Sequence, residues 1–296
     1  MLAHLSRVLC ASPPGAATAR GTGASAEESD KAPLAVEFQD VAAASFRLRG
    51  GVRHTPCAHS LRCSQMYGVD VYFKEDLKQL TGSFKERGAR NALLLLDPGQ
   101  RIAGVITASA GNHALALSHH AAMLDIPVTC VMPTTAPLTK VSRCREAGAT
   151  VVLHGAHIGH AREKAMVIAA DEGRQYINGY DDPAIIAGAG TLAIEMLDDL
   201  GDAACDAVLI PVGGGGLIAG MATVLKALRP EIEVIGVEPA ECASLTAALA
   251  AGKPVEVPFT GTLADGLAVP TMGSNAYEIC TAPALPSYCL TCVQGW

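Results

Sequence analysis

From residue 69 onward, the hydrophobic positions alternate between two periods. Apolar runs with strand character at 69–74, 102–107, 127–132, 150–153, 207–212 and 233–237 are separated by stretches of helical period at 84–96, 111–122, 138–147, 161–171, 185–200 and 217–228. Strands that alternate with helices in this way are typical of right-handed βαβ units with parallel strands. The pattern therefore predicts an α/β protein built on open parallel sheets.

Composition narrows the class of ligand. Half of the residues are hydrophobic but only 4% are aromatic, so Ala, Val, Leu and Ile must form the core, as they do in parallel sheets covered by helices. The formal net charge is -7, and Lys and Arg are not clustered, which argues against nucleic acid and anionic membrane as partners. No apolar run approaches the roughly 18 residues that a membrane helix requires. A small molecule is the ligand we expect.

Residues 80–89, Leu-Thr-Gly-Ser-Phe-Lys-Glu-Arg-Gly-Ala, set one lysine on a glycine-containing turn that leads into a helix. An amine buried in a pocket loses its charge more easily, and the neutral form can attack an aldehyde such as that of pyridoxal phosphate. The alternative is that Lys85 is a solvated lysine paired with Glu86 or Asp76.

Two loops between a strand and a helix carry further candidate chemistry. Four glycines, Gly213, Gly214, Gly215 and Gly216, follow a buried strand and open a helix, so their N–H groups are placed to hold a phosphate dianion. The alternative is a flexible turn. In the earlier loop, Ser109 and its backbone donors can receive a carboxylate and Asn112 can bond a phenolic oxygen, although both residues could equally cap a helix. We interpret His113 as structural.

The cysteines and the N-terminus bear on the compartment. Ten cysteines without paired spacing indicate reduced, intracellular thiols, and the single Cys289-x-x-Cys292 pair is weak support for zinc, so we expect no metal. Residues 1–32 are rich in Ala, Ser, Gly and Pro and hold no acidic residue before Glu27. That composition predicts a mitochondrial transit peptide, with an untargeted tail and a cytoplasmic protein as the alternative.

Three motifs in order, Ser-Phe-Lys85-x-Arg-Gly-Ala, Ser109-Ala-Gly-Asn-His and Pro-Val-Gly-Gly-Gly-Gly-Leu217, resemble the serine/threonine dehydratases. These are pyridoxal 5'-phosphate enzymes of fold type II, the tryptophan-synthase-β-like group. Further similarity lies in 180–191 and 261–266, the likeness spans roughly residues 35–279, and it looks closest to catabolic threonine dehydratase. The resemblance implies two open parallel-sheet α/β domains with the cofactor in the cleft between them. We divide the chain into a large domain (33–96 and 183–279), a small domain (97–182), an N-terminal tail (1–32) and a divergent tail (280–296).

The resemblance also implies a role for each motif residue. Lys85 would form the internal aldimine and act as the base, Phe84 would lie against the cofactor ring, and Ser109 would help to take the substrate carboxylate. Asn112 would bond the phenolic oxygen of the ring. The phosphate would be held by Gly213, Gly214, Gly215, Gly216 and Leu217. Glu86 and Arg87 are expected to form a surface or interdomain pair rather than to act in catalysis.

The expected function is that of an L-threonine/L-serine ammonia-lyase, which converts a small hydroxy amino acid into 2-oxobutyrate or pyruvate and ammonia by α,β-elimination. We expect a homo-oligomer, a dimer or a tetramer. The alternatives are a racemase, although Ala110 stands where serine racemase has its second catalytic serine, and an inactive truncated form. A cation site like that of the racemases would retain Glu238 but has Cys242 and Ser244 in place of its other ligands. Residues 280–296 have no periodic pattern, and we expect part of the large domain to be missing there.

Overall fold

The structure is a computed structural model that describes residues 34–201, 203–259, 261–282 and 289–293. The predicted mitochondrial segment, residues 1–32, lies outside the described residues. The described part is mixed α/β, with two parallel sheets and a small antiparallel ribbon. Its fold class is the one that the sequence pattern predicts. No described helix has both the length and the apolar character needed to span a membrane.

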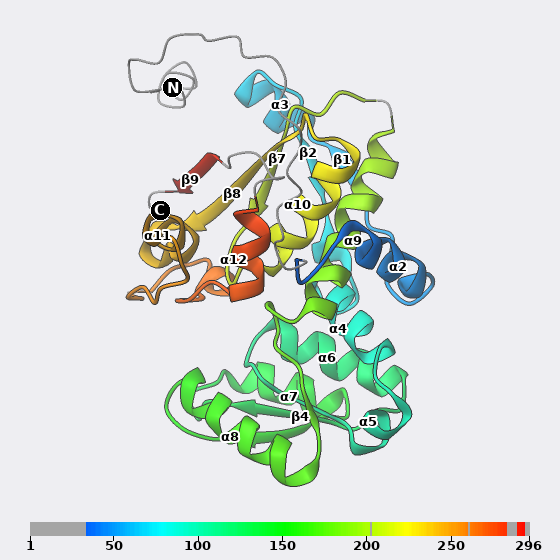
Figure 1. Ribbon diagram of the computed structural model, residues 1–296, viewed down its shortest axis with the longest axis vertical. Helices are drawn as coiled ribbons and strands as arrows, with labels where there is room; N and C mark the ends of the chain where they lie inside the picture. Colours follow the sequence, from blue (N-terminus) through cyan, green and yellow to red (C-terminus); the bar gives the residue numbers. More distant parts are fainter. Residues whose placement is uncertain (1–33, 202, 260, 283–288, 294–296) are drawn as a thin grey trace, which may run out of the picture.

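The first parallel sheet lies in the lower part of Figure 1 and has the strand order β5-β4-β3-β6. Its strands are β3 (Val105–Ala108), β4 (Val128–Met132), β5 (Thr150–Leu153) and β6 (Gln175–Tyr176). The connecting helices are α6 (Asn112–Met123), α7 (Leu138–Glu146) and α8 (Ile158–Glu172). Every residue of β4 is buried, because helices cover both faces of a parallel sheet.

The second parallel sheet has the order β7-β8-β9 and lies in the upper part of the view. It contains β7 (Ala207–Pro211), β8 (Glu233–Pro239) and β9 (Cys289–Val293). The elements that accompany it are α10 (Gly216–Leu228), η2 (Ala240–Cys242), α11 (Ser244–Ala251), η3 (Asp265–Leu267) and α12 (Ser274–Cys280). The strand β9 corrects our expectation of an aperiodic tail, since it pairs in parallel with β8 from Ile235 to Pro239.

The remaining elements surround and join the two sheets. They are α2 (Phe38–Leu48), β1 (Cys57–His59), α3 (Leu61–Tyr67), β2 (Tyr72–Lys74), η1 (Asp76–Lys78), α4 (Lys85–Leu94), α5 (Pro98–Ala103) and α9 (Pro183–Leu200). Asp182 begins α9, because its carboxylate accepts the amide hydrogen of Ala184 at 2.8 Å and Pro183 fixes the first helical φ. The helix α4 packs against α9 on one side and α6 on the other, and so connects the two parts of the molecule.

The strand expected at residues 102–107 is wrong in its first half. Residues 102 and 103 end the helix α5, and only from Val105 does the chain enter β3. The helix begins at a capping box in which Asp97 accepts from the amide of Gln100 at 2.8 Å while Gln100 reaches back to the amide of Asp97. Ile102, which looked like a buried strand residue, is 82% exposed on this helix.

Candidate functional site

Lys85 is the first residue of α4, directly after the turn at Gly82, whose φ is +86°. Its side chain is partly buried and its amine end is enclosed by protein, where Nζ donates to the carbonyl of Gly179 at 2.5 Å. Nζ also lies 5.1 Å from the centre of the Phe84 ring. Burial lowers the pKa of Lys85 from 10.5 to about 8. Neither Glu86 nor Asp76 pairs with it, because those carboxylates bind His120 and Arg87.

The segment after β6, residues 178–182, is the place where the three predicted motifs meet. Gly179 accepts from Lys85, and it packs so closely on the His113 ring that a Cβ on Gly179 would lie 2.7 Å from its Cγ. The next residue, Tyr180, packs on Gly214, where an added Cβ would lie 2.2 Å from the tyrosine ring. Residues 180–191 were noted in the sequence only because they resemble the family. The hydrophobic pattern did not indicate that the three motifs contact Gly179 and its neighbours.

The glycine loop forms the N-terminus of α10. Gly215 has a φ of +93°, which favours glycine, and a Cβ on Gly216 would lie 2.2 Å from the Tyr180 carbonyl oxygen. The glycines are therefore required for close packing, and the loop is no flexible turn. Among the described residues, no hydrogen bond uses the backbone amides of residues 213–217 as donors. These amides are therefore free to donate to a bound ligand. The Leu217 side chain packs in the core, which leaves only its amide for a ligand.

The second predicted loop occupies the N-terminus of α6. Ser109 Oγ accepts from the amide of Gly111 at 3.3 Å, and Asn112 is the exposed first residue of the helix. Among the described residues, no hydrogen bond joins either side chain to Lys85. His113 of the same motif lies closer to Lys85. It is buried, and within the described part of the chain neither ring nitrogen has a partner within hydrogen-bond distance. Burial and the nearby lysine lower the pKa of His113 to about 3, although the Ile177 backbone acts in the opposite direction.

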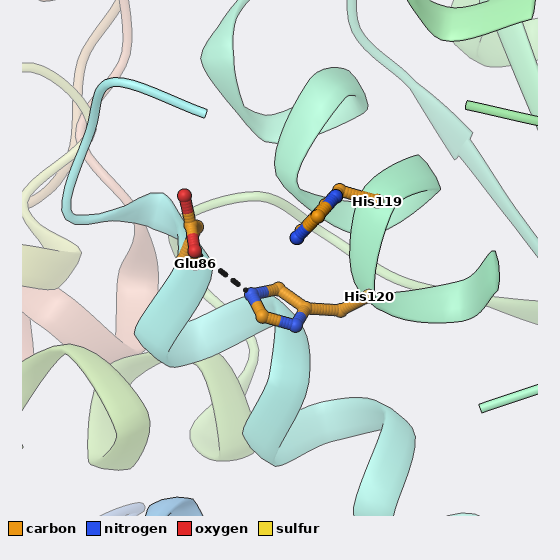
Figure 2. Close-up of side chains that lie close together, drawn as sticks. All are labelled: Glu86, His119 and His120. Carbon is orange, nitrogen blue, oxygen red and sulfur yellow. Dashed lines mark hydrogen bonds and ion pairs between the residues drawn. The ribbon is translucent and has the colours of Figure 1, made fainter. Parts of the chain in front are cut away.

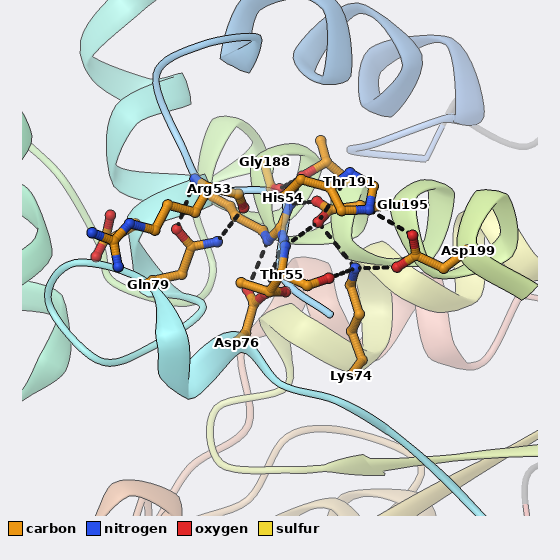
Figure 3. Close-up of polar contacts among 12 residues, drawn as sticks. Arg53, His54, Thr55, Lys74, Asp76, Gln79, Gly188, Thr191, Glu195 and Asp199 are labelled. Atoms are coloured by element: carbon orange, nitrogen blue, oxygen red, sulfur yellow. Dashed lines mark hydrogen bonds and ion pairs between the residues drawn. The ribbon is translucent and has the colours of Figure 1, made fainter. Parts of the chain in front are cut away.

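Arg87 rules out the surface alternative of the surface or interdomain pair that we expected. Its side chain is only 2% exposed and forms a bidentate contact with Asp76, at 2.7 Å and 2.9 Å, and a 2.5 Å contact with Glu195. Glu195 also accepts from Lys74, which Figure 3 shows between Glu195 and Asp199. This network ties the start of α4 to α9, two residues after Lys85 in the sequence.

Glu86 is not at the surface either, because its side chain is fully buried and faces α6. Figure 2 shows it beside His119 and His120, and no motif in the sequence connects these three residues. Glu238, the retained carboxylate of the expected racemase-like cation site, instead accepts from the amides of Leu245 at 2.9 Å and Thr246 at 2.8 Å at the start of α11.

Comparison with known protein families and structures gives one consistent result. The family model described as "Pyridoxal-phosphate dependent enzyme" matches residues 48–288. The chain is 44% identical over 237 residues to an L-threonine ammonia-lyase of Geobacter sulfurreducens, an alignment that covers 80% of this chain and 58% of that protein. The chain therefore spans less than two thirds of the length of this relative.

Solved structures are similar over most of the chain as well. The processed form of threonine deaminase isoform 2 from Solanum lycopersicum matches with a TM-score of 0.80 and 37% identity, over 86% of this chain and 73% of that one. Maize serine racemase matches with a TM-score of 0.82 and 30% identity, over 87% and 77%.

Proposed function

Because the chain belongs to the family of pyridoxal-phosphate dependent enzymes, we propose that it is an L-threonine/L-serine ammonia-lyase. The net reaction would release ammonia from a small hydroxy amino acid and yield 2-oxobutyrate from threonine or pyruvate from serine. The water that leaves across Cα and Cβ would be taken up again when the resulting imine is hydrolysed. The similarity to an L-threonine ammonia-lyase and to a threonine deaminase structure supports this reaction over others of the family.

The residues present fit pyridoxal phosphate. Its aldehyde requires an amine that loses its proton near neutral pH, and burial gives Lys85 that property. Its phosphate requires several converging donors, and the unpaired amides of Gly213, Gly214, Gly215 and Gly216 stand at the positive end of α10. Beside Lys85, the buried Ser83 Oγ also lacks a partner among the described residues. We therefore assign the lysine and the glycine loop to the cofactor.

The chain's own residues have distinct tasks in the proposed reaction. When bound, pyridoxal phosphate supplies an aldehyde that captures amines and a conjugated ring that withdraws electrons from the substrate Cα. Lys85 Nζ would hold the cofactor and, as a free amine, would accept the proton from the substrate Cα. The Gly179 carbonyl accepts a hydrogen from Nζ and so fixes the direction of the amine. Ser109 and the amides at the start of α6 would orient the substrate carboxylate, and Asn112 the phenolic oxygen of the ring.

One observation carries the proposal: Lys85, His113 at the start of α6 and the glycine loop all converge on Gly179 and Tyr180. The test is to incubate the purified chain, loaded with pyridoxal phosphate, with L-threonine and to measure 2-oxobutyrate. We expect Lys85→Ala to lower the rate by about 10²–10⁴-fold, the range that a positioned general base contributes. The matched control, Lys253→Ala, removes an exposed lysine and should keep the rate. Product formation that survives Lys85→Ala would refute the assignment.

Racemisation is the second candidate, because maize serine racemase is similar in structure. Transfer of a proton to the opposite face of Cα needs an acid on that face, and Ala110 has no such group. We therefore expect negligible D-serine from L-serine by chiral chromatography. Appreciable D-serine together with little pyruvate would favour the racemase, and no product at all would favour the inactive form.

We also propose that the chain forms a homo-oligomer through the apolar surface around α3. No residue of α3 is buried, and large apolar side chains are exposed there and in the neighbouring ribbon: Leu61, Met66, Tyr67, Val69, Tyr72 and Phe73. An exposed apolar patch of this kind is typical of an interaction surface. Light scattering during size-exclusion chromatography tests this, and a Met66→Lys variant should shift the mass toward the monomer if the surface is correct.

Mitochondrial targeting by residues 1–32 remains a proposal, supported by basic Arg7 and Arg20 and by the lack of acidic residues before Glu27. Fusing residues 1–35 to a fluorescent reporter tests it. A reporter confined to the cytoplasm would support the untargeted tail.

A further inference from the structure

A buried polar group joins the helix that carries Lys85 to the helix that begins with Asn112. Glu86 of α4 and His120 of α6 both have fully buried side chains, and Glu86 Oε2 lies 3.1 Å from His120 Nε2. The other carboxylate oxygen, Oε1, accepts the amide hydrogen of Thr81. Thr81 lies in the turn that leads into Lys85, so this one carboxylate holds both the turn and α6 (Figure 2).

The direction of the hydrogen bonds in this group follows from Arg90. Its Nη1 lies 3.3 Å from His120 Nδ1, and a guanidinium can only donate, so Nδ1 must be the acceptor. The ring proton of a neutral His120 is then on Nε2, which donates to Glu86. Glu86 therefore receives two hydrogen bonds, one on each oxygen. Burial alone would raise the pKa of Glu86, but these bonds from His120 and Thr81 outweigh it and hold the pKa below its usual value.

The same side chains could be taken for a metal site. Ligand atoms of Glu86, His119 and His120 all lie within 4.8 Å of one another, and His119 Nε2 is buried without a partner among the described residues. Two points oppose a cation. The contact with Arg90 assigns the ring proton of a neutral His120 to Nε2, and the Arg90 guanidinium itself lies at the opposite edge of that ring. In metal sites the far nitrogen of a ligating histidine donates to an acceptor, which is the reverse of this arrangement.

We propose that Glu86 is a positioning residue for Lys85, and that His120 and the Thr81 amide hold its carboxylate so that the lysine turn and α6 keep a fixed relation. This rests on the proposed function, because it assumes that Lys85 is the residue that binds the cofactor. In this proposal Glu86 contacts neither substrate nor cofactor. It acts on Lys85 indirectly, through the turn that contains Thr81 and through its contact with α6.

We call Glu86 and its two hydrogen-bond donors, the Thr81 amide and His120 Nε2, the clamp. The clamp predicts that a Glu86→Gln variant loses the positioning role. Both facing groups, Thr81 N–H and His120 Nε2–H, are donors, and an amide offers an acceptor to only one of them while its NH₂ meets the other. In contrast, His120→Gln keeps a donor toward Glu86 and an oxygen that can accept from Arg90. His120→Leu removes the donor at similar volume.

The experiment measures how fast pyridoxal phosphate becomes attached to Lys85, by borohydride quenching at timed intervals and peptide mass spectrometry, and so needs no turnover. We expect Glu86→Gln and His120→Leu to lower the rate roughly tenfold, the effect of one lost charged hydrogen bond, and His120→Gln to stay within about twofold of the unchanged chain. His119→Leu is the matched control on the neighbouring position and should leave the rate unchanged. Circular dichroism verifies that each variant is folded.

The outcomes separate the two proposals. If the unchanged chain does not attach the cofactor at Lys85, the proposed function fails. If it does and Glu86→Gln attaches it equally fast, or if His120→Gln is as slow as His120→Leu, the clamp is refuted. Should His120→Leu not fold, the comparison of Glu86→Gln with His120→Gln decides. One equivalent of Zn²⁺ bound by the unchanged chain and lost in His119→Leu would also overturn the clamp, in favour of a cation site.

Discussion

At the scale of single residues, the chemistry of the proposed site depends on one amine in an unusual setting. Lys85 is the first residue of a helix, where the dipole is positive and a charged amine is disfavoured. Burial adds to this and lowers its pKa to about 8. The Gly179 carbonyl can accept a hydrogen from either protonation state, so it orients Nζ without preventing the loss of the proton.

The lowered pKa predicts the pH dependence of cofactor attachment. At pH 8 about half of Lys85 is neutral, against about 0.3% of a lysine whose pKa is 10.5. The rate of attachment should therefore rise with pH to a plateau whose midpoint is near 8. Borohydride trapping across pH 6 to 10 measures it, with a blocked lysine derivative as the reference. A midpoint equal to that of the reference would show that the amine is solvated.

The same shift has a consequence for stability. A lysine with a lower pKa in the folded state than in the unfolded state makes the unfolded chain bind more protons between pH 8 and 10.5, so stability rises with pH across that window. Below pH 8 the cost of the buried charge is fully present. Lys85→Met should therefore raise the free energy of unfolding by about 1–3 kcal/mol at pH 7, and the gain should disappear above pH 10.5. Urea titrations at pH 7 and 10.5 measure the difference, and equal gains at both values would contradict it.

The two residues after Lys85 show what residue-level interpretation of the sequence misses. Glu86 and Arg87 look like solvated helix residues because charged side chains are rarely buried without a partner. Their partners come from far along the chain, His120 on α6 and Glu195 on α9. These partners can be identified only from the packing of the helices. For the same reason, the sequence did not indicate that His119 and His120 lie beside Glu86. Lys85 could be chosen without such distant contacts, because the turn and the helix start are local and the family resemblance of the three motifs identified this lysine.

At the scale of elements, three helices around the site cross at glycines. Gly88 of α4 faces α9 where a Cβ would lie 2.8 Å from the Ile185 carbonyl oxygen, and Gly188 of α9 faces the Arg87 carbonyl oxygen at 2.6 Å. Two residues further along α9, Gly190 meets Gly220 of α10 with similarly short distances. The backbones therefore approach closely enough that the position of Lys85 is linked to that of the glycine loop through α9.

This crossing predicts a large cost for an added methyl group. A Cβ at Gly220 would lie 2.3 Å from the Ile186 carbonyl oxygen and 2.7 Å from the Gly190 nitrogen, and backbone atoms cannot move aside as a side chain can. We expect Gly220→Ala to lower the free energy of unfolding by about 2–4 kcal/mol despite the higher helix propensity of alanine. Gly266→Ala, with nothing within 4 Å of its Cβ, is the control and should change little. A urea titration compares them, and equal values would contradict the close crossing.

Most elements follow from the hydrophobic pattern because long, strongly periodic segments fix the type of element. The expected helix at 185–200 corresponds to Pro183–Leu200, and the expected strand at 150–153 to Thr150–Leu153. The errors have local causes. The capping box at Asp97 starts a helix that extends into residues where an apolar run suggested a strand. The strand β9 has only five residues, Cys289–Val293, which is too short a segment to show a clear hydrophobic period. Strand order was beyond the sequence, since it depends on pairing between distant segments.

At the scale of the whole molecule, the candidate site lies where the two sheet-containing parts are joined. The segment 178–182 leaves β6 of the first sheet, crosses Lys85 and the glycine loop, and enters α9, which packs on α10 beside the second sheet. Asp181 adds a further connection, since its carboxylate accepts from the amides of Ser274 at 2.9 Å and Ala276 at 3.0 Å at the start of α12. The division into a large and a small domain at 97–182 stays a prediction, and its boundaries await limited proteolysis.

The last prediction concerns binding of the cofactor by the whole molecule. A ligand that binds only the folded state adds about 2.7 kcal/mol of stability at a concentration 100 times its dissociation constant. For a chain of this size that corresponds to a rise in melting temperature of about 5–10 °C. Pyridoxal phosphate should produce such a rise in the unchanged chain, and pyridoxal without the phosphate a clearly smaller one, because the amides of the glycine loop would have no anion to bind. Lys85→Ala should retain part of the rise, since it keeps the loop but loses the covalent bond. Differential scanning fluorimetry with Lys253→Ala as the control measures all four, and equal rises with pyridoxal and its phosphate would remove the glycine loop from the site while leaving Lys85 in place.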